Sequence, residues 1–143
     1  MLSNTCIYAV RASIYLALNA EKSNKIGIKT ISKELSIPAP FLAKILQTLA
    51  KHKLFSSTKG PNGGFGLSKD PHKITLYDIV TIFDGNELFE KCLISLRSCN
   101  EENMPCPMHN SYMEIREKIK LMFKEQTIGD LADEIKMNNK LII

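Results

Sequence analysis

Three cysteines and one histidine lie along a single polar stretch near the middle of the carboxy-terminal half. The stretch reads CLISLRSCNEENMPCPMHN, with six residues between successive cysteines and a histidine three residues after the last one. Its polar middle and the two prolines that follow predict that at least Cys99 lies on a loop and not in a packed helix. Thiolates and imidazole are ligands of transition metals. The candidate ligands are Cys92, Cys99, Cys106 and His109.

Three chemistries are open to these side chains. Thiolates are the usual ligands of iron–sulfur clusters, and a histidine can replace one of them. Three cysteines and a histidine can also hold zinc, and loop thiols can act as a redox switch without a metal. A thiol oxidoreductase that uses Cys106 with His109 is disfavoured, because the chain contains no C-x-x-C motif. The chain is therefore not expected to be an enzyme.

Length and composition bound the fold. The chain has 143 residues, of which 44% are hydrophobic, which predicts one ordinary core with an appendage. No run of 18 apolar residues is present, so no membrane-spanning helix is expected. The apolar amino-terminal stretch lacks the basic start of a signal peptide, so the cytoplasm is the expected location. In that compartment four cysteines indicate metal or redox chemistry and not structural disulfides.

Charge is distributed unevenly along the chain. Residues 1–73 contain 11 Lys and Arg against 3 Asp and Glu, whereas residues 74–143 contain 8 against 12. A basic amino-terminal half joined to an acidic half is typical of a nucleic-acid-binding module with a sensing or assembly module. Solvated lysines on an ordinary surface would give the same count, so charge alone does not decide.

Two short amphipathic helices are predicted between residues 28 and 53. Thr30 is a candidate cap for the first, which would bury Ile31 and Leu35, and Ser36 begins a tight turn. Pro38 and Pro40 suit the opening of a second helix, where a missing N–H is no loss. The second helix would bury its leucines and Ile45 and expose basic and polar side chains. This is the helix-turn-helix arrangement, although any helical hairpin would share the pattern.

A hairpin follows directly. LFSSTKGPNGGFGLSK predicts strands over 54–58 and 65–68, joined by a glycine-rich turn. A hairpin after a recognition helix is a wing, which can contact the sugar-phosphate backbone or the minor groove. The competing interpretation, a nucleotide-binding loop, lacks the G-x-x-x-x-G-K-[ST] pattern.

The remaining chain predicts three further helices. Thr75 and Asp78 form a capping box at the start of ITLYDIV. A longer helix over 111–124 carries a narrow apolar stripe between charged flanks, which suits a seam between two copies of the chain; packing on its own domain is the alternative. The stripe consists of Met108, Tyr112, Ile115, Ile119 and Met122, and its flanks include Arg116. Thr127 is the expected cap of the last helix.

Taken together, the helix-turn-helix, the GPNGGF wing, the ITLYDIV helix and the spaced cysteines resemble the IscR/NsrR-type family of bacterial winged-helix transcription regulators. The resemblance covers residues 1 to 135. It implies a mainly α fold with a small β-hairpin, divided into a winged helix-turn-helix domain (1–84), a cysteine-rich cluster-binding loop (85–110) and a dimerisation and carboxy-terminal helical region (111–143). It also implies a homodimer on a palindromic operator in double-stranded DNA.

In cluster-bearing members of that family the three cysteines ligate an iron–sulfur cluster. By resemblance Cys92, Cys99 and Cys106 match these ligands, and His109 matches the imidazole that completes a two-iron cluster. A two-iron two-sulfur cluster is therefore favoured, with a four-iron four-sulfur cluster as the alternative. The expected function is a DNA-binding regulator, a repressor, that senses iron–sulfur, nitric oxide or redox status. The alternative is a cluster-free regulator that responds through a protein partner, zinc or thiol oxidation.

The DNA contacts are expected on the second helix of the helix-turn-helix and on the wing. Short apolar side chains at the helix start can meet thymine methyl groups, whereas lysines contact phosphates, so affinity should depend steeply on salt. The alternative for each lysine is an ordinary solvated charge. The candidate DNA-binding residues are Lys33, Ala39, Pro40, Phe41, Lys44, Lys51, Lys59, Asn62 and Gly63.

Overall fold

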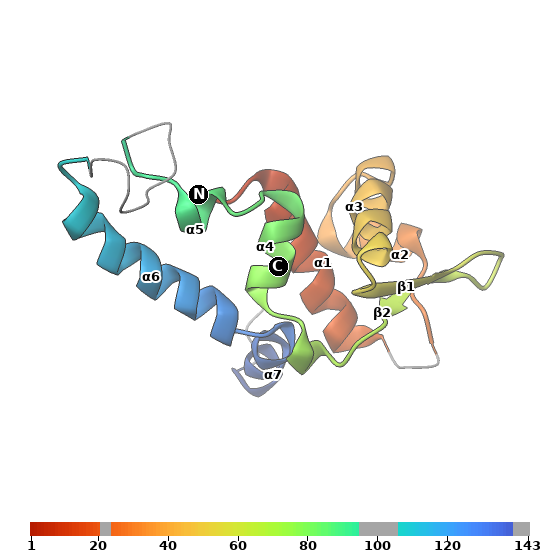
Figure 1. Ribbon diagram of the computed structural model, residues 1–143. Helices are drawn as coiled ribbons and strands as arrows, with labels where there is room; N and C mark the ends of the chain where they lie inside the picture. The colour runs from red at the N-terminus through yellow and green to blue at the C-terminus, as the bar shows by residue number, and fades with distance from the viewer. Residues whose placement is uncertain (21–23, 95–105, 139–143) are drawn as a thin grey trace.

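The computed structural model describes residues 1–20, 24–94 and 106–138. Within these ranges the chain is mostly helical and carries one two-stranded hairpin (Figure 1). The elements in chain order are α1 (Asn4–Asn19), α2 (Ile28–Leu35), α3 (Ala39–Lys51), β1 (Phe55–Thr58), β2 (Gly64–Leu67), the 3-10 turn η1 (Pro71–Lys73), α4 (Leu76–Phe83), α5 (Glu87–Glu90), α6 (His109–Glu125) and α7 (Ile128–Asn138).

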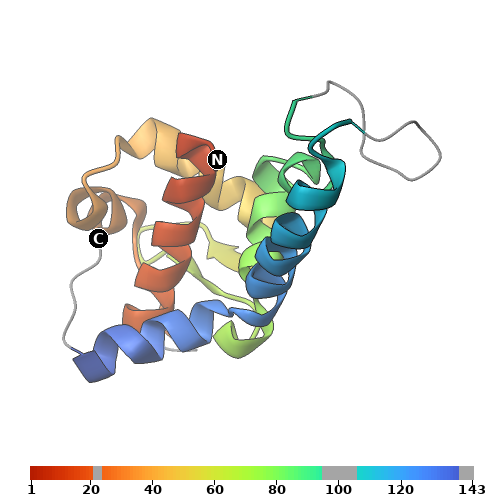
Figure 2. The same ribbon diagram turned by 90° about the vertical axis from the view of Figure 1, so that its left-hand side faces the viewer.

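Helix α1 is the central element of the core. It packs against α2, α3, α4, α7 and β2, and Figures 1 and 2 show it between the helix-turn-helix and the carboxy-terminal helices. Small side chains at Cys6, Ala9 and Ala12 are fully buried. Because small side chains let neighbouring backbones approach closely, they allow one helix to serve several partners. Ser3 caps the helix by accepting a hydrogen bond from the Cys6 N–H.

Helices α2 and α3 form the predicted helix-turn-helix. The buried face of α3 consists of Leu42, Ile45, Leu46 and Leu49, as the pattern predicts. Ser36 adopts the left-handed conformation (φ 55°) at the end of α2, and the buried Ile37 anchors the turn. One boundary prediction was wrong: α2 begins at Ile28 after Gly27, and not after Thr30. No side chain caps that helix start.

Strands β1 and β2 form the predicted wing. They pair antiparallel, with Phe55 opposite Leu67 and Thr58 opposite Gly64. The chain before α2 also joins this hairpin: the N–H of Ile26 donates to the Phe65 carbonyl at 2.9 Å, and the Phe65 N–H donates to the Ile26 carbonyl at 2.8 Å. A third segment therefore fixes the wing near the turn end of its strands.

The carboxy-terminal helices are started by two similar caps. Thr75 and Asp78 form the predicted capping box of α4, and Thr127 and Asp130 make the equivalent hydrogen bonds before α7. The two threonines also form an antiparallel bridge. Because both helices start from this bridge, α4 and α7 are fixed relative to one another.

The expected fold class is confirmed: helices dominate, and the hairpin follows a helix-turn-helix. Helix α6 is longer than expected, since it begins at His109 and ends at Glu125. It runs along one edge of the molecule, beside α4 and α5 (Figures 1 and 2). In the described part of the chain, no helix is both long and apolar enough to cross a membrane.

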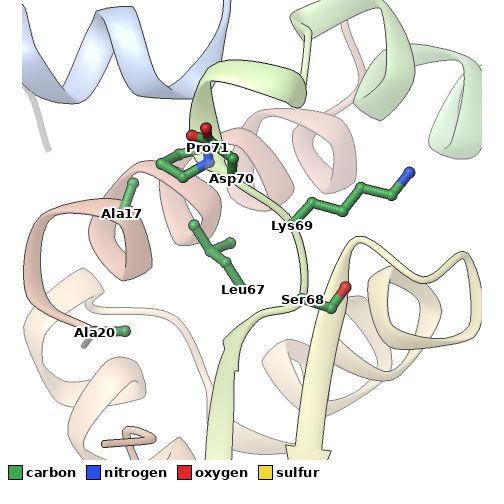
Figure 3. A pocket seen from close by; sticks show the side chains of 7 residues that line it. All are labelled: Ala17, Ala20, Leu67, Ser68, Lys69, Asp70 and Pro71. Atoms are coloured by element: carbon green, nitrogen blue, oxygen red, sulfur yellow. The ribbon is translucent and has the colours of Figure 1, made fainter. Parts of the chain in front are cut away.

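A pocket of about 680 Å³ opens where the end of α1 meets β2 and η1. In Figure 3 Leu67 points toward Ala17, whereas the side chain of Lys69 extends away from both. None of the predicted site residues is among the described residues that line this pocket. The candidate sites therefore lie elsewhere, on the outer face of α3, on the wing and at the start of α6.

Candidate DNA interface and cysteine site

The outer face of α3 presents the predicted DNA contacts to solvent. Pro40, Lys44 and Lys51 are exposed, Phe41 is 38% exposed, and Ala39 is half-buried. The helix buries its opposite face in the core, so the side chains of Pro40, Lys44 and Lys51 project together. Lys33 is exposed on α2. The fold therefore brings Pro40, Lys44 and Lys51 onto one accessible face of α3, with Ala39 and Phe41 on the two sides of that face.

The wing carries the remaining predicted contacts. Lys59 and Asn62 are exposed in the loop between β1 and β2. Gly63 is half-buried, and its N–H donates to the Gly60 carbonyl at 2.9 Å. A Cβ atom at Gly63 would lie 2.2 Å from the Thr58 carbonyl oxygen. Glycine is therefore required at this position by the turn itself.

A cation and two aromatic rings attach α3 to α1, and the sequence analysis did not identify this contact. Nη2 of Arg11 donates to the Leu35 carbonyl at the end of α2, at 3.2 Å. The Arg11 guanidinium carbon lies 5.8 Å from the centre of the Tyr8 ring, and the Tyr8 ring meets the Phe41 ring edge-on at 5.8 Å. A cation within an otherwise apolar helix was the available signal, because such a charge needs a partner.

A lysine before α2 likewise fixes the wing. Nζ of Lys25 donates to the Thr58 Oγ1 at 2.6 Å, next to the bridge between Ile26 and Phe65. In the sequence this lysine stands in a polar break with no periodic pattern, so no local signal indicated its partner. Its ammonium group is engaged by the wing, which distinguishes it from the exposed lysines of α3.

Two of the predicted cysteine ligands lie together at the start of α6. The sulfur atoms of Cys92 and Cys106 are 2.9 Å apart, longer than the roughly 2.05 Å of a disulfide bond. Both side chains are partly buried. Cys99 lies outside the described residues. The fold therefore brings into contact two thiols whose positions in the sequence differ by 14.

His109 is the first residue of α6, directly beyond this pair. It is 7% exposed, and its N–H donates to the Cys106 carbonyl at 2.9 Å. Among the described residues no three His, Cys, Asp or Glu side chains lie close enough together to hold a metal. His109 is thus adjacent to the thiol pair through the backbone, and its role as fourth ligand stays a prediction.

A buried arginine lies on the same helix, two turns after His109. Arg116 is 7% exposed, and its Nη1 donates to the Glu90 carbonyl at 3.3 Å. Its Nε is buried and has no hydrogen-bond partner. The sequence places Arg116 in a charged flank of the apolar stripe, and the structure buries this member of the flank. Its spacing of seven residues from His109 puts both on one helix face, but the sequence alone does not show that this face is buried.

The donors at this position suit an iron–sulfur cluster or a soft metal ion. Such centres need thiolate ligands, which carry negative charge. The structure offers a pair of thiols on neighbouring segments and, on the adjacent helix, a buried guanidinium with an orphaned N–H. A positive charge of this kind favours an anionic centre nearby. The residues present therefore fit the group that the sequence pattern indicates.

The fourth cysteine is unlike this pair. Cys6 is completely buried in α1, and burial, together with the nearby Asp84 carboxylate, raises the pKa of its thiol to about 12. A thiol with so high a pKa is a poor nucleophile and a poor ligand at neutral pH. Its expected role as a small buried side chain agrees with this position.

A histidine links η1 to α7 on the opposite side of the molecule. Nε2 of His72 lies 2.8 Å from an Asp133 carboxylate oxygen, and its Nδ1 lies 3.3 Å from Asp70. Hydrogen bonds to these two carboxylates raise the pKa of His72 above its usual value. The ring also packs against Gly129, where a Cβ atom would lie 2.5 Å from it.

Comparison with known proteins places this geometry in a family. A putative HTH-type transcriptional regulator of Aquifex aeolicus (strain VF5) is 41% identical over 134 residues, which cover 93% of this chain and 92% of the relative. The HTH-type transcriptional regulator IscR of Klebsiella pneumoniae (strain 342) is 27% identical over 126 residues, covering 88% of this chain and 76% of the relative.

Solved structures share the fold. CymR, the global cysteine regulator of B. subtilis, superposes with a TM-score of 0.76 at 24% identity, over 94% of this chain and 97% of that one. IscR of T. potens superposes with a TM-score of 0.74 at 18% identity, over 99% of this chain and 92% of that one. The family model described as Rrf2, iron-dependent transcriptional regulator, matches residues 2–134. The chain therefore belongs to the Rrf2 family of transcriptional regulators, which are DNA-binding proteins and not enzymes.

Proposed function

We propose that this regulator is a homodimeric repressor that binds a palindromic operator and is controlled by an iron–sulfur cluster. Cys92, Cys99 and Cys106 would supply three thiolates to the cluster, and His109 would supply the fourth ligand. A two-iron two-sulfur cluster fits this donor set, because a histidine commonly replaces a thiolate on such clusters. When bound, the cluster would supply redox and nitric-oxide chemistry. The chain's own residues supply the anchoring and the coupling to DNA.

One observation carries the proposal: the 2.9 Å separation of the Cys92 and Cys106 sulfur atoms at the start of α6. The two cysteines stand at the two ends of the segment that contains Cys99. A ligand held by all three would therefore fix both ends of that segment at once. His109 immediately follows, so the same ligand would fix the first turn of α6.

The exposed face of α6 supports a dimer. Met108, Ile115 and Met122, three of the five residues in the predicted stripe, are 40%, 55% and 53% exposed. The other face packs on α4 and α5, and Ile119 lies against the core. Large apolar side chains that line one exposed helix face are typical of a protein interface. A second copy of α6 would cover them, and the two wings would then address the two half-sites of an operator.

DNA binding would combine the outer face of α3 with the tip of the wing. Lys44 and Lys51 on α3, and Lys59 on the wing, have exposed ammonium groups for phosphates. The exposed Phe41 ring provides an apolar contact for a thymine methyl group. Coupling to the cysteines would act through α6, because a ligand shifts an equilibrium only by binding one arrangement better than the other.

The test begins with anaerobic purification. The protein should be coloured, contain iron and acid-labile sulfide, and lose all three when Cys92, Cys99 and Cys106 are replaced by alanine. Cys6→Ala is the matched control, because this thiol is completely buried in the core and its substitution should leave the cluster unchanged. Colourless protein without iron after reconstitution with ferrous iron and sulfide would refute the proposal. Zinc in stoichiometric amount would support the Cys3His alternative.

The same distance between the Cys92 and Cys106 sulfur atoms favours a second candidate function, a thiol–disulfide switch. Two sulfurs at 2.9 Å need only a small shift to form a disulfide between Cys92 and Cys106. Such a switch would release two protons and pass two electrons to an oxidant such as a peroxide. Mass spectrometry of the protein after peroxide treatment would detect a loss of two hydrogen masses and a peptide pair that contains both cysteines. Protein that bound a cluster and formed no such pair would exclude this candidate.

A further inference from the structure

Among the described residues, the buried guanidinium of Arg116 has a single carboxylate within 4 Å, and that carboxylate is largely exposed. Its side chain is 8% exposed, and the nearest carboxylate oxygen, on Glu117, lies 3.9 Å away on a side chain that is 57% exposed. Nη1 donates to a neutral carbonyl, that of Glu90, at 3.3 Å. Nε is buried without any hydrogen-bond partner. The charge is therefore only partly compensated by what surrounds it.

Such a group is costly in a folded protein. Moving a charge out of water carries a large penalty unless the charge is paired and its hydrogen-bonding groups are satisfied. Buried polar groups without partners are rare in native proteins, and each requires an explanation. A hydrophobic residue of similar length would pack at this position without the penalty. An anion that binds near this guanidinium would explain why the charge is buried.

The position of Arg116 indicates that the cysteine site would hold this anion. Its Nη1 holds the Glu90 carbonyl, two residues before Cys92. On α6 it lies seven residues after His109, which is also buried, so the two side chains share one helix face. The guanidinium is thus placed against the segment that leads into the cysteine site and on the helix that starts from it.

We propose that Arg116 is the internal counter-cation of the cysteine site. It would act as a positioning residue that holds the backbone before Cys92 and whose charge offsets that of the bound centre. This inference rests on the proposed function. Three thiolates and a neutral imidazole around an oxidised two-iron two-sulfur core leave a net negative charge, and reduction makes it more negative. A zinc ion in the same ligand set also leaves a net negative charge.

The proposal predicts effects of opposite sign in the two forms of the protein. In the metal-free form, Arg116→Met removes a buried charge that is only partly compensated, so the melting temperature should stay the same or rise. In the loaded form the same substitution removes the counter-charge, so affinity for the centre should fall. Residues that hold metal ligands in place typically contribute about 10-fold to 100-fold in metal affinity. A merely structural arginine would lower the stability of both forms.

The experiment compares three variants with the unaltered chain. Arg116→Met removes the charge, Arg116→Lys keeps it but cannot reproduce the planar contact, and Lys118→Met is the control, since Lys118 lies on the same helix with a 74% exposed side chain. Each protein is reconstituted anaerobically with ferrous iron and sulfide, and separately with zinc chloride. Retention against a chelator, melting temperature with and without metal, and the reduction potential of the cluster are measured.

We expect Arg116→Met to lose the centre at least roughly 10-fold more readily and to shift the reduction potential to more negative values. Arg116→Lys should recover most of the potential, and Lys118→Met should match the unaltered chain. If Arg116→Met destabilised the metal-free and loaded forms equally and left the reduction potential unchanged, the role of Arg116 as counter-cation would be wrong. The proposed function would still stand. An unaltered chain that takes up neither iron–sulfur nor zinc would overturn the proposed function and this inference with it.

Discussion

Replacing Gly64 by alanine should detach the wing from the rest of the DNA-binding module. Gly64 is buried at the start of β2, opposite Thr58. A Cβ atom there would lie 2.4 Å from the Ile26 carbonyl oxygen and 2.9 Å from the Gly27 nitrogen. These neighbours are backbone atoms and cannot rotate away. The strand therefore has to move off the segment before α2.

The cost follows from the contacts that this movement breaks. Two backbone hydrogen bonds join Ile26 to Phe65, at 2.9 Å and 2.8 Å. Each contributes about 1 kcal/mol net, and forcing an extra carbon into a packed position costs about 1–3 kcal/mol. The two costs overlap, because a strand that moves away relieves the strain while losing the bonds. We therefore expect Gly64→Ala to lower the free energy of unfolding by about 2–3 kcal/mol.

The matched control lies two residues further along the same strand. A Cβ atom at Gly66 would meet the Lys25 side chain at 3.6 Å and the Ser56 Oγ at 3.7 Å, which are ordinary contacts. Since a glycine within a strand costs about 0.5–1 kcal/mol relative to alanine, Gly66→Ala should be neutral or slightly stabilising. Urea unfolding followed by circular dichroism measures the free energy of unfolding of both variants. Equal stability of the two variants would refute the argument that close approach to Ile26 determines the wing position.

Three further predictions concern charge and reactivity. Hydrogen bonds to Asp133 and Asp70 raise the pKa of His72, so the stability that the protonated ring contributes is complete below its usual pKa of about 6.5 and is lost as pH rises through the raised value. The urea midpoint of His72→Gln should therefore be lower than that of the unaltered chain at pH 5.5, and the two midpoints should converge in alkaline buffer. Cys6, with a thiol pKa of about 12, should resist iodoacetamide at pH 8 in the folded protein and react in urea, and equal rates in both would contradict its burial. Replacing Lys44 or Lys59 by alanine should lower the slope of log affinity for a mixed-sequence duplex against log salt by roughly 1 each, as measured by fluorescence anisotropy.

The elements that sequence patterns predicted are those specified by local chemistry. The buried face of α3 follows helical spacing, and its four apolar residues are buried as expected. The Thr75 and Asp78 capping box depends only on residues three apart, and both of its hydrogen bonds form. The start of α2 was missed because Gly27 makes no side-chain cap there. A boundary without a capping side chain leaves nothing in the sequence to detect.

Contacts between distant segments could not be predicted in this way. Lys44 and Lys25 are the same residue type, yet Lys44 is exposed on α3 whereas Lys25 donates a hydrogen bond to Thr58 on the wing. Their difference depends on where the chain before α2 crosses the hairpin. The same limit applied to Arg116, which stands among charged neighbours but faces inward. Helical spacing gives the direction of a side chain only when the inward face is already known.

The cysteine site and the DNA-binding face are joined by packed elements. His109 starts α6, α6 packs on α4, and α4 packs on α1. Helix α1 then reaches α3 through the Tyr8 and Phe41 rings. Close-packed helices of this kind transmit displacement and resist bending, because their side chains leave little free volume. We infer that a centre bound at the cysteines acts on the orientation of α6 as a whole.

Such an action would change the separation of the two DNA-binding units in a dimer and leave the interior of each unit unchanged. Each winged helix-turn-helix is held internally by the hydrogen bond from Arg11 of α1 to the end of α2 and by the bridge between Ile26 and Phe65. A rotation of α6 would therefore carry each unit as a rigid body and alter the separation of two units across a dimer. Affinity for a two-half-site operator would then depend on the bound centre, whereas affinity for a single half-site would not. Equal sensitivity of both duplexes to cluster loading would contradict this reasoning.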